Sequence, residues 1–143
     1  MGDGSKPAGE LLLKADLYEI RAEGRVIRCV LNIPARTAPA LGASSALDVG
    51  EWLVSNVLKP RSQWLGPIVD VRLGPSVFGP VTRSVTERLM TSAAQSRRRM
   101  ALLVGSSPTQ RDQFLEMARL YAQRYSCVTS DPDAALTWLT TSD

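Results

Sequence analysis

The chain has 143 residues, of which 44% are hydrophobic and 22% are charged, and its formal net charge is +3. This length and balance are typical of one globular domain with a single hydrophobic core. The charge is too small to indicate nucleic-acid binding, and the apolar runs are far shorter than the ~20 residues of a membrane helix. We therefore expect no nucleic-acid partner and no membrane span.

The first 15 residues are interpreted as a flexible tail, and residues 16–143 as one domain. The start, MGDGSKPAGE, lacks a basic region followed by an apolar one, so we expect no secretory signal and a cytoplasmic protein. The segment LYEIRAEGRVIRCVLNI alternates between apolar and polar residues on either side of Glu23 and Gly24. This pattern predicts an antiparallel pair of strands joined by a tight turn.

The next segment, PARTAPALGASS at 34–45, is rich in proline, alanine and glycine and is interpreted as a loop. Apolar residues then recur at helical spacing from Val49 to Val57, which predicts a helix. We expect this helix to end near Lys59, because Pro60 disfavours helical geometry in the residue before it.

Two continuous apolar runs, WLGPIVDVRL and MALLVG, predict buried strands. A helix is expected after each, the first with Pro80 in its first turn and the second with Pro108 after a capping box of Ser107 and Gln110. CVTS predicts a short edge strand, and Asp131 caps a last helix. The order β-β-α-β-α-β-α-β-α favours one α/β domain whose mixed, mostly parallel sheet begins with an antiparallel hairpin.

The chain contains two cysteines, Cys29 and Cys127, and no histidine. Neither cysteine belongs to a CxxC motif, so we expect no metal site. Both are interpreted as small hydrophobic residues in a reducing cytoplasm. Without histidine, the chain lacks the commonest general base at neutral pH, and no phosphate loop or dinucleotide motif is present. We expect a protein that is not an enzyme and that holds no cofactor.

Several stretches resemble the STAS domain, a family named after sulfate transporters and anti-sigma-factor antagonists. TAPAL at 37–41 resembles the family's segment after its early strands, and IVDVRLGPSVFGP at 68–80 resembles its next strand and loop. ALLVGSSPTQRDQF at 101–114 resembles the following strand and helix, and TSDPDAALTWL at 129–139 resembles the closing helix. The resemblance implies a STAS-like fold and a non-catalytic regulatory module that binds a protein, such as a kinase, a sigma-factor regulator or a component of a larger assembly.

The sequence departs from the family at the start of the second helix. In the antagonist branch, a serine of an Asp-Ser-Ser-Gly motif is phosphorylated by a partner kinase. Here Val77 and Phe78 take the place of the apolar pair before that motif, and the next four residues are GPVT. Neither this alignment nor one shifted by a residue supplies the acceptor serine. We therefore expect the standard phospho-switch to be missing and the segment 74–84 to remain as a binding surface.

Two strand–helix junctions are expected to open at the carboxyl edge of the sheet, where ligands bind in α/β proteins. The candidate partner- or anion-binding residues at these junctions are Ser76, Val77, Phe78, Thr82, Arg83, Ser106 and Arg111. Exposed Val77 and Phe78 favour a protein partner, whereas a pocket lined by Arg83 and Arg111 favours the alternative, a small-molecule or anion-binding domain. Capping of backbone groups also explains the hydroxyl side chains.

Three arginines at 97–99 follow a predicted helix and are interpreted as solvated charges that stabilise its dipole. The carboxylates are dispersed along the chain. An enzyme would need one of them, or Cys29, held in a cleft beside a group that perturbs its pKa. We expect any homodimer to form through the first hairpin or an edge strand.

Overall fold

The computed structural model describes residues 9–34, 36–75 and 79–141. Six strands form one mixed sheet in chain order, with two antiparallel pairs at the N-terminal end followed by parallel pairs. The strands are β1 (Glu10–Lys14), β2 (Tyr18–Glu23), β3 (Val26–Asn32), β4 (Gly66–Leu73), β5 (Met100–Leu103) and β6 (Ser126–Thr129). The helices are α1 (Pro39–Asn56), α2 (Pro80–Ser96), α3 (Pro108–Tyr121) and α4 (Pro132–Thr140). The predicted α/β class is confirmed.

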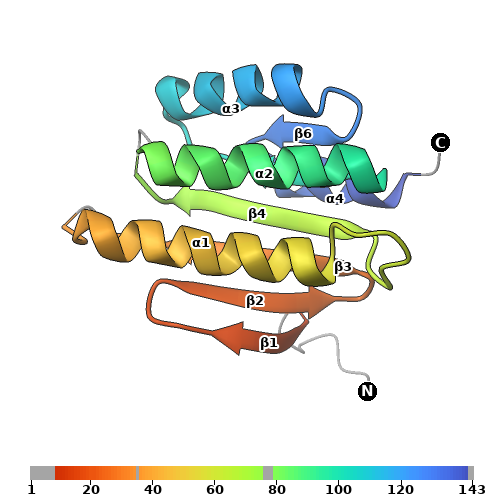
Figure 1. Ribbon diagram of the computed structural model, residues 1–143, viewed down its shortest axis with the longest axis horizontal. Coiled ribbons are helices and arrows are strands. Elements are labelled where there is room, and N and C mark those ends of the chain that lie inside the picture. The colour runs from red at the N-terminus through yellow and green to blue at the C-terminus, as the bar shows by residue number, and fades with distance from the viewer. Residues whose placement is uncertain (1–8, 35, 76–78, 142–143) are drawn as a thin grey trace.

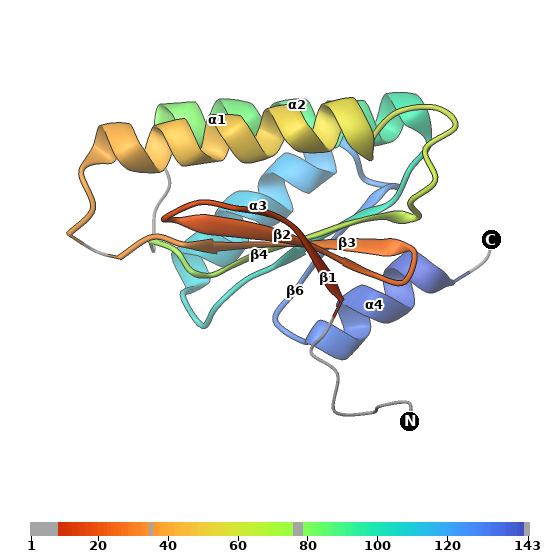
Figure 2. The ribbon, with the colours of Figure 1, turned by 90° about the horizontal axis from the view of Figure 1, so that it is seen from below.

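The helices divide unequally between the two faces of the sheet. α1, α2 and α3 cover one face, and α4 covers part of the other (Figures 1 and 2). The main core lies under the first three helices and includes Ile27, Leu53 and Phe114. A smaller core under α4 includes Ile68 and Leu103. Within the described ranges, no helix combines the length and apolar character needed to cross a membrane.

Each described helix begins with a proline. The first N–H groups of a helix have no intrahelical partner, so a proline, which has no N–H group, loses no hydrogen bond there. The predicted caps of α3 and α4 are confirmed. Ser107 Oγ accepts a hydrogen bond from the backbone N–H of Gln110 (3.3 Å), and Asp131 Oδ1 accepts one from that of Asp133 (3.0 Å). The reciprocal half of the capping box at α3 is not formed, because the Gln110 side chain bonds to other groups.

The helix predicted from Val49 begins earlier than expected. Residues 39–45, interpreted from the sequence as loop, form the first turns of α1. Small residues occupy several of its buried positions, including Ser45, Ala46 and Gly50. The buried positions in the first half of the helix, Ser45 and Ala46, therefore carry no large apolar side chain that would reveal helical spacing.

The prediction of a flexible tail is wrong for residues 10–14. They form β1, an edge strand that pairs antiparallel with β2. The register shifts at a bulge between Leu11 and Leu13, and all three consecutive leucines are exposed. A bulge places an extra residue in one strand, so this strand lacks the strict alternation by which a half-buried strand is recognised.

Gly50 allows α1 and α2 to approach closely. It is buried, and a Cβ atom added to it would lie 2.5 Å from Cγ1 of Val85 in α2. Val85 is β-branched and therefore has little rotamer freedom in a helix. At Gly42, earlier in α1, the nearest atom to an added Cβ would be Cγ2 of Ile33, at 3.7 Å.

The substitution Gly50→Ala is expected to lower the free energy of unfolding by about 1–2 kcal/mol, because overpacking against Val85 outweighs the gain in helix propensity. The matched variant Gly42→Ala should raise it by about 0.5–1 kcal/mol, because its Cβ meets only an ordinary contact. Urea denaturation measures both values. A similar gain in the two variants would contradict the close approach of the helices.

Candidate functional site

The parallel strands end at one edge of the sheet, and both candidate junctions lie there (Figure 1). β4 and β5 are hydrogen-bonded neighbours, as the expected cleft requires. Ser76, Val77 and Phe78 lie outside the described residues. The remaining candidates belong to the start of α2 (Thr82 and Arg83) and to the start of α3 and the loop before it (Ser106 and Arg111).

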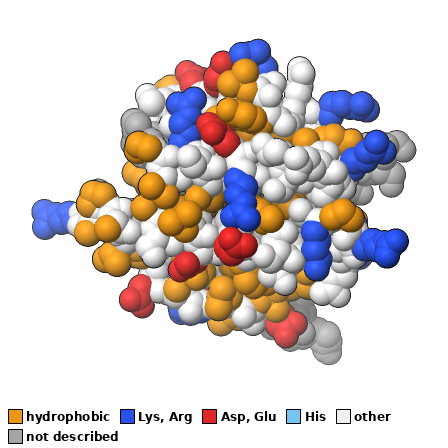
Figure 3. All heavy atoms as spheres, in the orientation of Figure 1, with side chains coloured by type: hydrophobic (Ala, Val, Ile, Leu, Met, Phe, Trp, Pro, Cys, Tyr) orange, Lys and Arg blue, Asp and Glu red, His pale blue; other side chains and the backbone are white. Residues whose placement is uncertain are grey.

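An apolar hollow of about 360 Å³ lies between the first turns of α1 and α2. Its described lining residues are Ile33, Pro34, Thr37, Ala38, Pro39, Gly42, Ala43, Pro75, Gly79, Pro80, Val81 and Thr82. The segments that form it also expose Leu41, Leu73 and Val81, by 59%, 57% and 40%. In Figure 3 apolar side chains gather over the beginning of α1. Of the predicted site residues, Thr82 lies here.

A second hollow, of about 620 Å³, lies across the ends of β5 and β6 and is called the β5–β6 hollow. Its described lining residues are Arg72, Val104, Gly105, Ser106, Ser107, Pro108, Arg111, Asp112, Leu115 and Ser130. The structure therefore brings the predicted residues Ser106 and Arg111 together. It also adds Arg72 and Ser130, which the sequence did not single out.

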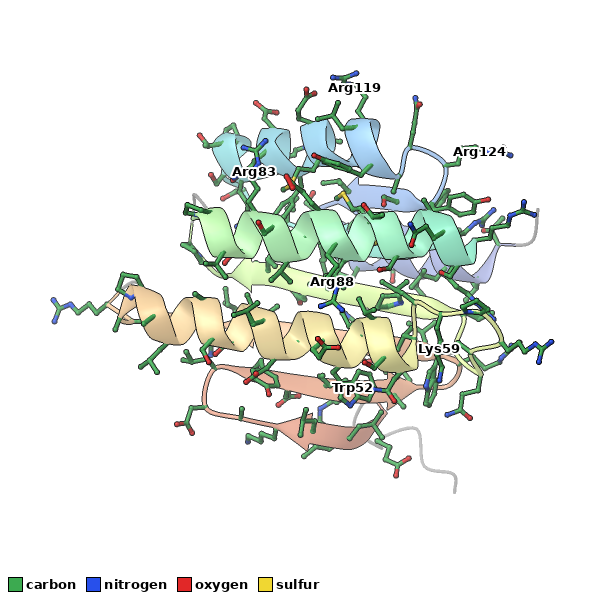
Figure 4. The ribbon with its side chains drawn as sticks, in the orientation of Figure 1. Trp52, Lys59, Arg83, Arg88, Arg119 and Arg124 are labelled. Carbon is green, nitrogen blue, oxygen red and sulfur yellow. The ribbon has the colours of Figure 1, made fainter. Side chains whose placement is uncertain are left out.

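Arg83 is not among the described lining residues of either hollow. Its side chain projects from α2 on the side of α3 (Figure 4), and its Nε atom lies 3.6 Å from a carboxylate oxygen of Glu87. Hydrogen bonding to Arg119 lowers the pKa of Glu116 in α3, and the charge of Arg83 adds to this effect. The described residues thus do not form the expected pair of Arg83 and Arg111.

Arg72 is held in place by a buried carboxylate. The Asp70 side chain is 6% exposed and accepts hydrogen bonds from Arg72 Nε (3.0 Å), from Nη2 (2.7 Å) and from the backbone N–H (3.0 Å). Hydrogen bonding to Asp70 raises the pKa of Arg72. The two residues are two positions apart on a strand, which places them on the same face. This spacing is the sequence signal that could have identified the pair.

Gln110 joins the two loops at this edge of the sheet. Its side chain is buried, its Oε1 accepts a hydrogen bond from the Gly105 N–H (2.9 Å), and its Nε2 donates to the Pro75 carbonyl (2.9 Å). A longer bond from Nε2 reaches the Val71 carbonyl (3.4 Å). One amide therefore connects the loop after β5 to the loop after β4.

The substitution Gln110→Ala is expected to lower the free energy of unfolding by about 2–3 kcal/mol, because the Gly105 N–H and the Pro75 carbonyl lose their hydrogen-bond partner. Amide hydrogen exchange should also become faster at Gly105. The matched variant Gln123→Ala, at an exposed position, should change stability by less than about 0.5 kcal/mol. Equal stability of the two variants in urea would show that the amide does not hold the loops together.

The arginines at 97–99 are less solvated than the sequence suggested. Arg98 Nη1 donates to the Trp64 carbonyl (3.2 Å) and Arg99 Nη1 to the Trp138 carbonyl (2.9 Å). The Arg99 guanidinium also lies 4.6 Å from the centre of the Trp138 ring, as in a cation–π contact. Arg98 and Arg99 therefore tie the segment between α2 and β5 to neighbouring segments, and the interpretation as a solvated helix end is wrong for these two residues.

Cys29 does not meet the condition set for a nucleophile. It is fully buried, and burial raises its thiol pKa, so the thiol rather than the reactive thiolate is present. Cys127 is half-buried, and burial raises its pKa as well. Among the described residues, no three cysteine, aspartate or glutamate side chains are grouped so that they could hold a metal ion.

Thiol labelling of the folded protein with an aromatic disulfide reagent is expected to modify Cys127 alone, and more slowly than a free thiol. The raised pKa leaves less thiolate at pH 8, so the rate should increase as the pH rises. Cys127→Ser should abolish labelling until the protein is unfolded with urea. Rapid native labelling of that variant would show that Cys29 is accessible and activated.

No protein-family model matches the chain, and no curated protein or solved structure matches it significantly. The resemblance to the STAS domain therefore rests on the motifs of the sequence.

Proposed function

We propose that this chain is a non-catalytic, cytoplasmic interaction module of STAS type, which binds a protein partner through the segment 74–84 and the surface beside it. The observation that carries the proposal is the apolar hollow together with the exposed apolar side chains of the segments that form it. Leu41, Leu73 and Val81 come from the start of α1, the end of β4 and the start of α2, yet all belong to the segments around one hollow.

A protein surface fits this arrangement better than a small ligand does. A ligand confined to about 360 Å³ would cover the walls of the hollow but leave Leu41 and Leu73 exposed. Exposed apolar patches on a protein surface are typical of protein–protein interfaces. A partner that inserts one apolar side chain into the hollow, as interface anchors do, would also contact exposed apolar residues on the segments that form it.

The motifs of the sequence support the same surface. IVDVRLGPSVFGP, the stretch that resembles the STAS strand and loop, ends at the hollow, where Gly79 and Pro80 are lining residues. Because the sequence offers no acceptor serine at the standard position, we propose that binding here is not controlled by phosphorylation at the start of α2.

The test replaces Val81→Asp, with Ser84→Asp as the matched control on the same helix. Both positions are exposed and lie near the N-terminus of α2, where a carboxylate is compatible with the helix dipole. Only Val81 lines the apolar hollow, so a charge there would be buried by a partner. We expect affinity capture from the native cells, quantified by mass spectrometry, to recover the same protein with wild type and Ser84→Asp and at least about 10-fold less with Val81→Asp.

Equal recovery with Val81→Asp and Ser84→Asp would move the interface away from the apolar hollow. If the wild type retains no protein specifically, the proposal that this chain is an interaction module is wrong. Thermal unfolding of the three proteins verifies that the comparison is made between folded chains.

A further inference from the structure

The chain leaves β5 and β6 toward opposite faces of the sheet. The segment after β5 leads to α3, on the face that α1 and α2 also cover, whereas the segment after β6 leads to α4 on the other face (Figure 2). β5 and β6 are adjacent parallel strands. In open α/β sheets, diverging connections of this kind leave a crevice outside the carboxyl ends of the strands, and ligands bind in it. The β5–β6 hollow lies at this position, with Gly105 on one side and Ser130 on the other.

Two arginines from different elements line this crevice. Arg72 comes from the end of β4 and Arg111 from the second turn of α3. The Arg72 guanidinium is oriented by Asp70, which uses its Nε and one Nη2 hydrogen and leaves Nη1 available, and the Arg72 side chain is 41% exposed. The Arg111 guanidinium forms no ion pair with any described residue. Both therefore retain donors for a ligand.

The geometry points to a binding site for a small molecule that carries a phosphate group. Two guanidinium groups suit an anion with several acceptor oxygens, and Ser106 and Ser130, whose side chains carry hydroxyl groups, line the same space. The volume of about 620 Å³ exceeds what a phosphate alone occupies and lies in the range of small-molecule pockets. This site is separate from the apolar hollow and does not depend on the proposed protein partner.

Asp112 limits the kind of ligand. It also lines the β5–β6 hollow, and its carboxylate repels an anion but accepts hydrogen bonds from hydroxyl groups. Inorganic phosphate should therefore bind more weakly than a hydroxylated phosphate ester, whose hydroxyl groups can face Asp112 while the phosphate faces the arginines.

The experiment titrates glycerol 3-phosphate and inorganic phosphate into the full chain by calorimetry, at fixed ionic strength. We expect saturable binding of the ester and weaker binding of phosphate. Arg111→Gln should weaken binding of the ester about 10-fold through loss of a charge-assisted hydrogen bond. The control Arg124→Gln removes an exposed arginine at the opposite edge of the sheet (Figure 4) and should bind as the wild type does. Asp112→Asn should tighten binding of inorganic phosphate.

Amide chemical shifts locate the site, with the largest changes expected at Gly105, Ser106 and Ser130. No saturable binding of the ester at millimolar concentrations would overturn the proposal. Equal weakening by Arg111→Gln and Arg124→Gln would also overturn it, since it would show attraction to overall charge alone. The substituted residues are all exposed, and thermal unfolding establishes that each variant remains folded.

Discussion

The burial of β4 and β5 on both faces is the constraint on which the rest of the structure depends. Ile68 and Leu103 belong to the core under α4, while Val69 and Leu102 belong to the main core. Strands that are apolar on both sides need cover on both sides. The crossover helices α1, α2 and α3 all lie on one face, so the chain must pass to the other face after β6 for α4 to supply the second cover. That passage also makes the crevice between β5 and β6.

The parts of the fold that the sequence predicts are those with a local signal. Continuous apolar runs indicate β4 and β5, and alternation indicates β2 and β3, because side chains on a strand repeat every two residues. The start of α1 and the strand β1 have no such signal. A bulge interrupts β1, and the small residues Ser45 and Ala46 occupy the buried positions in the first half of α1. Within the predicted part of the helix, Gly50 is needed because Val85, far along the sequence, leaves no space for a side chain. Requirements of this kind arise only when the helices are packed together.

The sequence predicts where the candidate site lies in the fold better than it predicts which side chains contact one another there. Parallel topology is enough to bring the two junctions to one edge of the sheet. Whether a side chain at that edge points to one hollow or another depends on the neighbouring helix, and Arg83 extends toward Glu87 on its own helix. Arg72 was detectable in principle, since Asp70 precedes it by two positions on the same strand. The role of Gln110 was not, because its partner Pro75 is 35 residues away.

Gln110 relates the two hollows to each other. Its bond to the Pro75 carbonyl holds a residue that lines the apolar hollow, and its bond from the Gly105 N–H holds one that lines the β5–β6 hollow. A buried amide with both ends satisfied fixes the distance between the loops, because shifting either loop would leave a polar group unpaired. The hollows nevertheless differ in chemistry, since no charged side chain is among the described lining residues of the apolar hollow, whereas two arginines and Asp112 line the β5–β6 hollow. A single buried side chain thus supports two surfaces of different chemistry, and a substitution at Val81 or Arg111 can alter one surface without disturbing the amide that holds both.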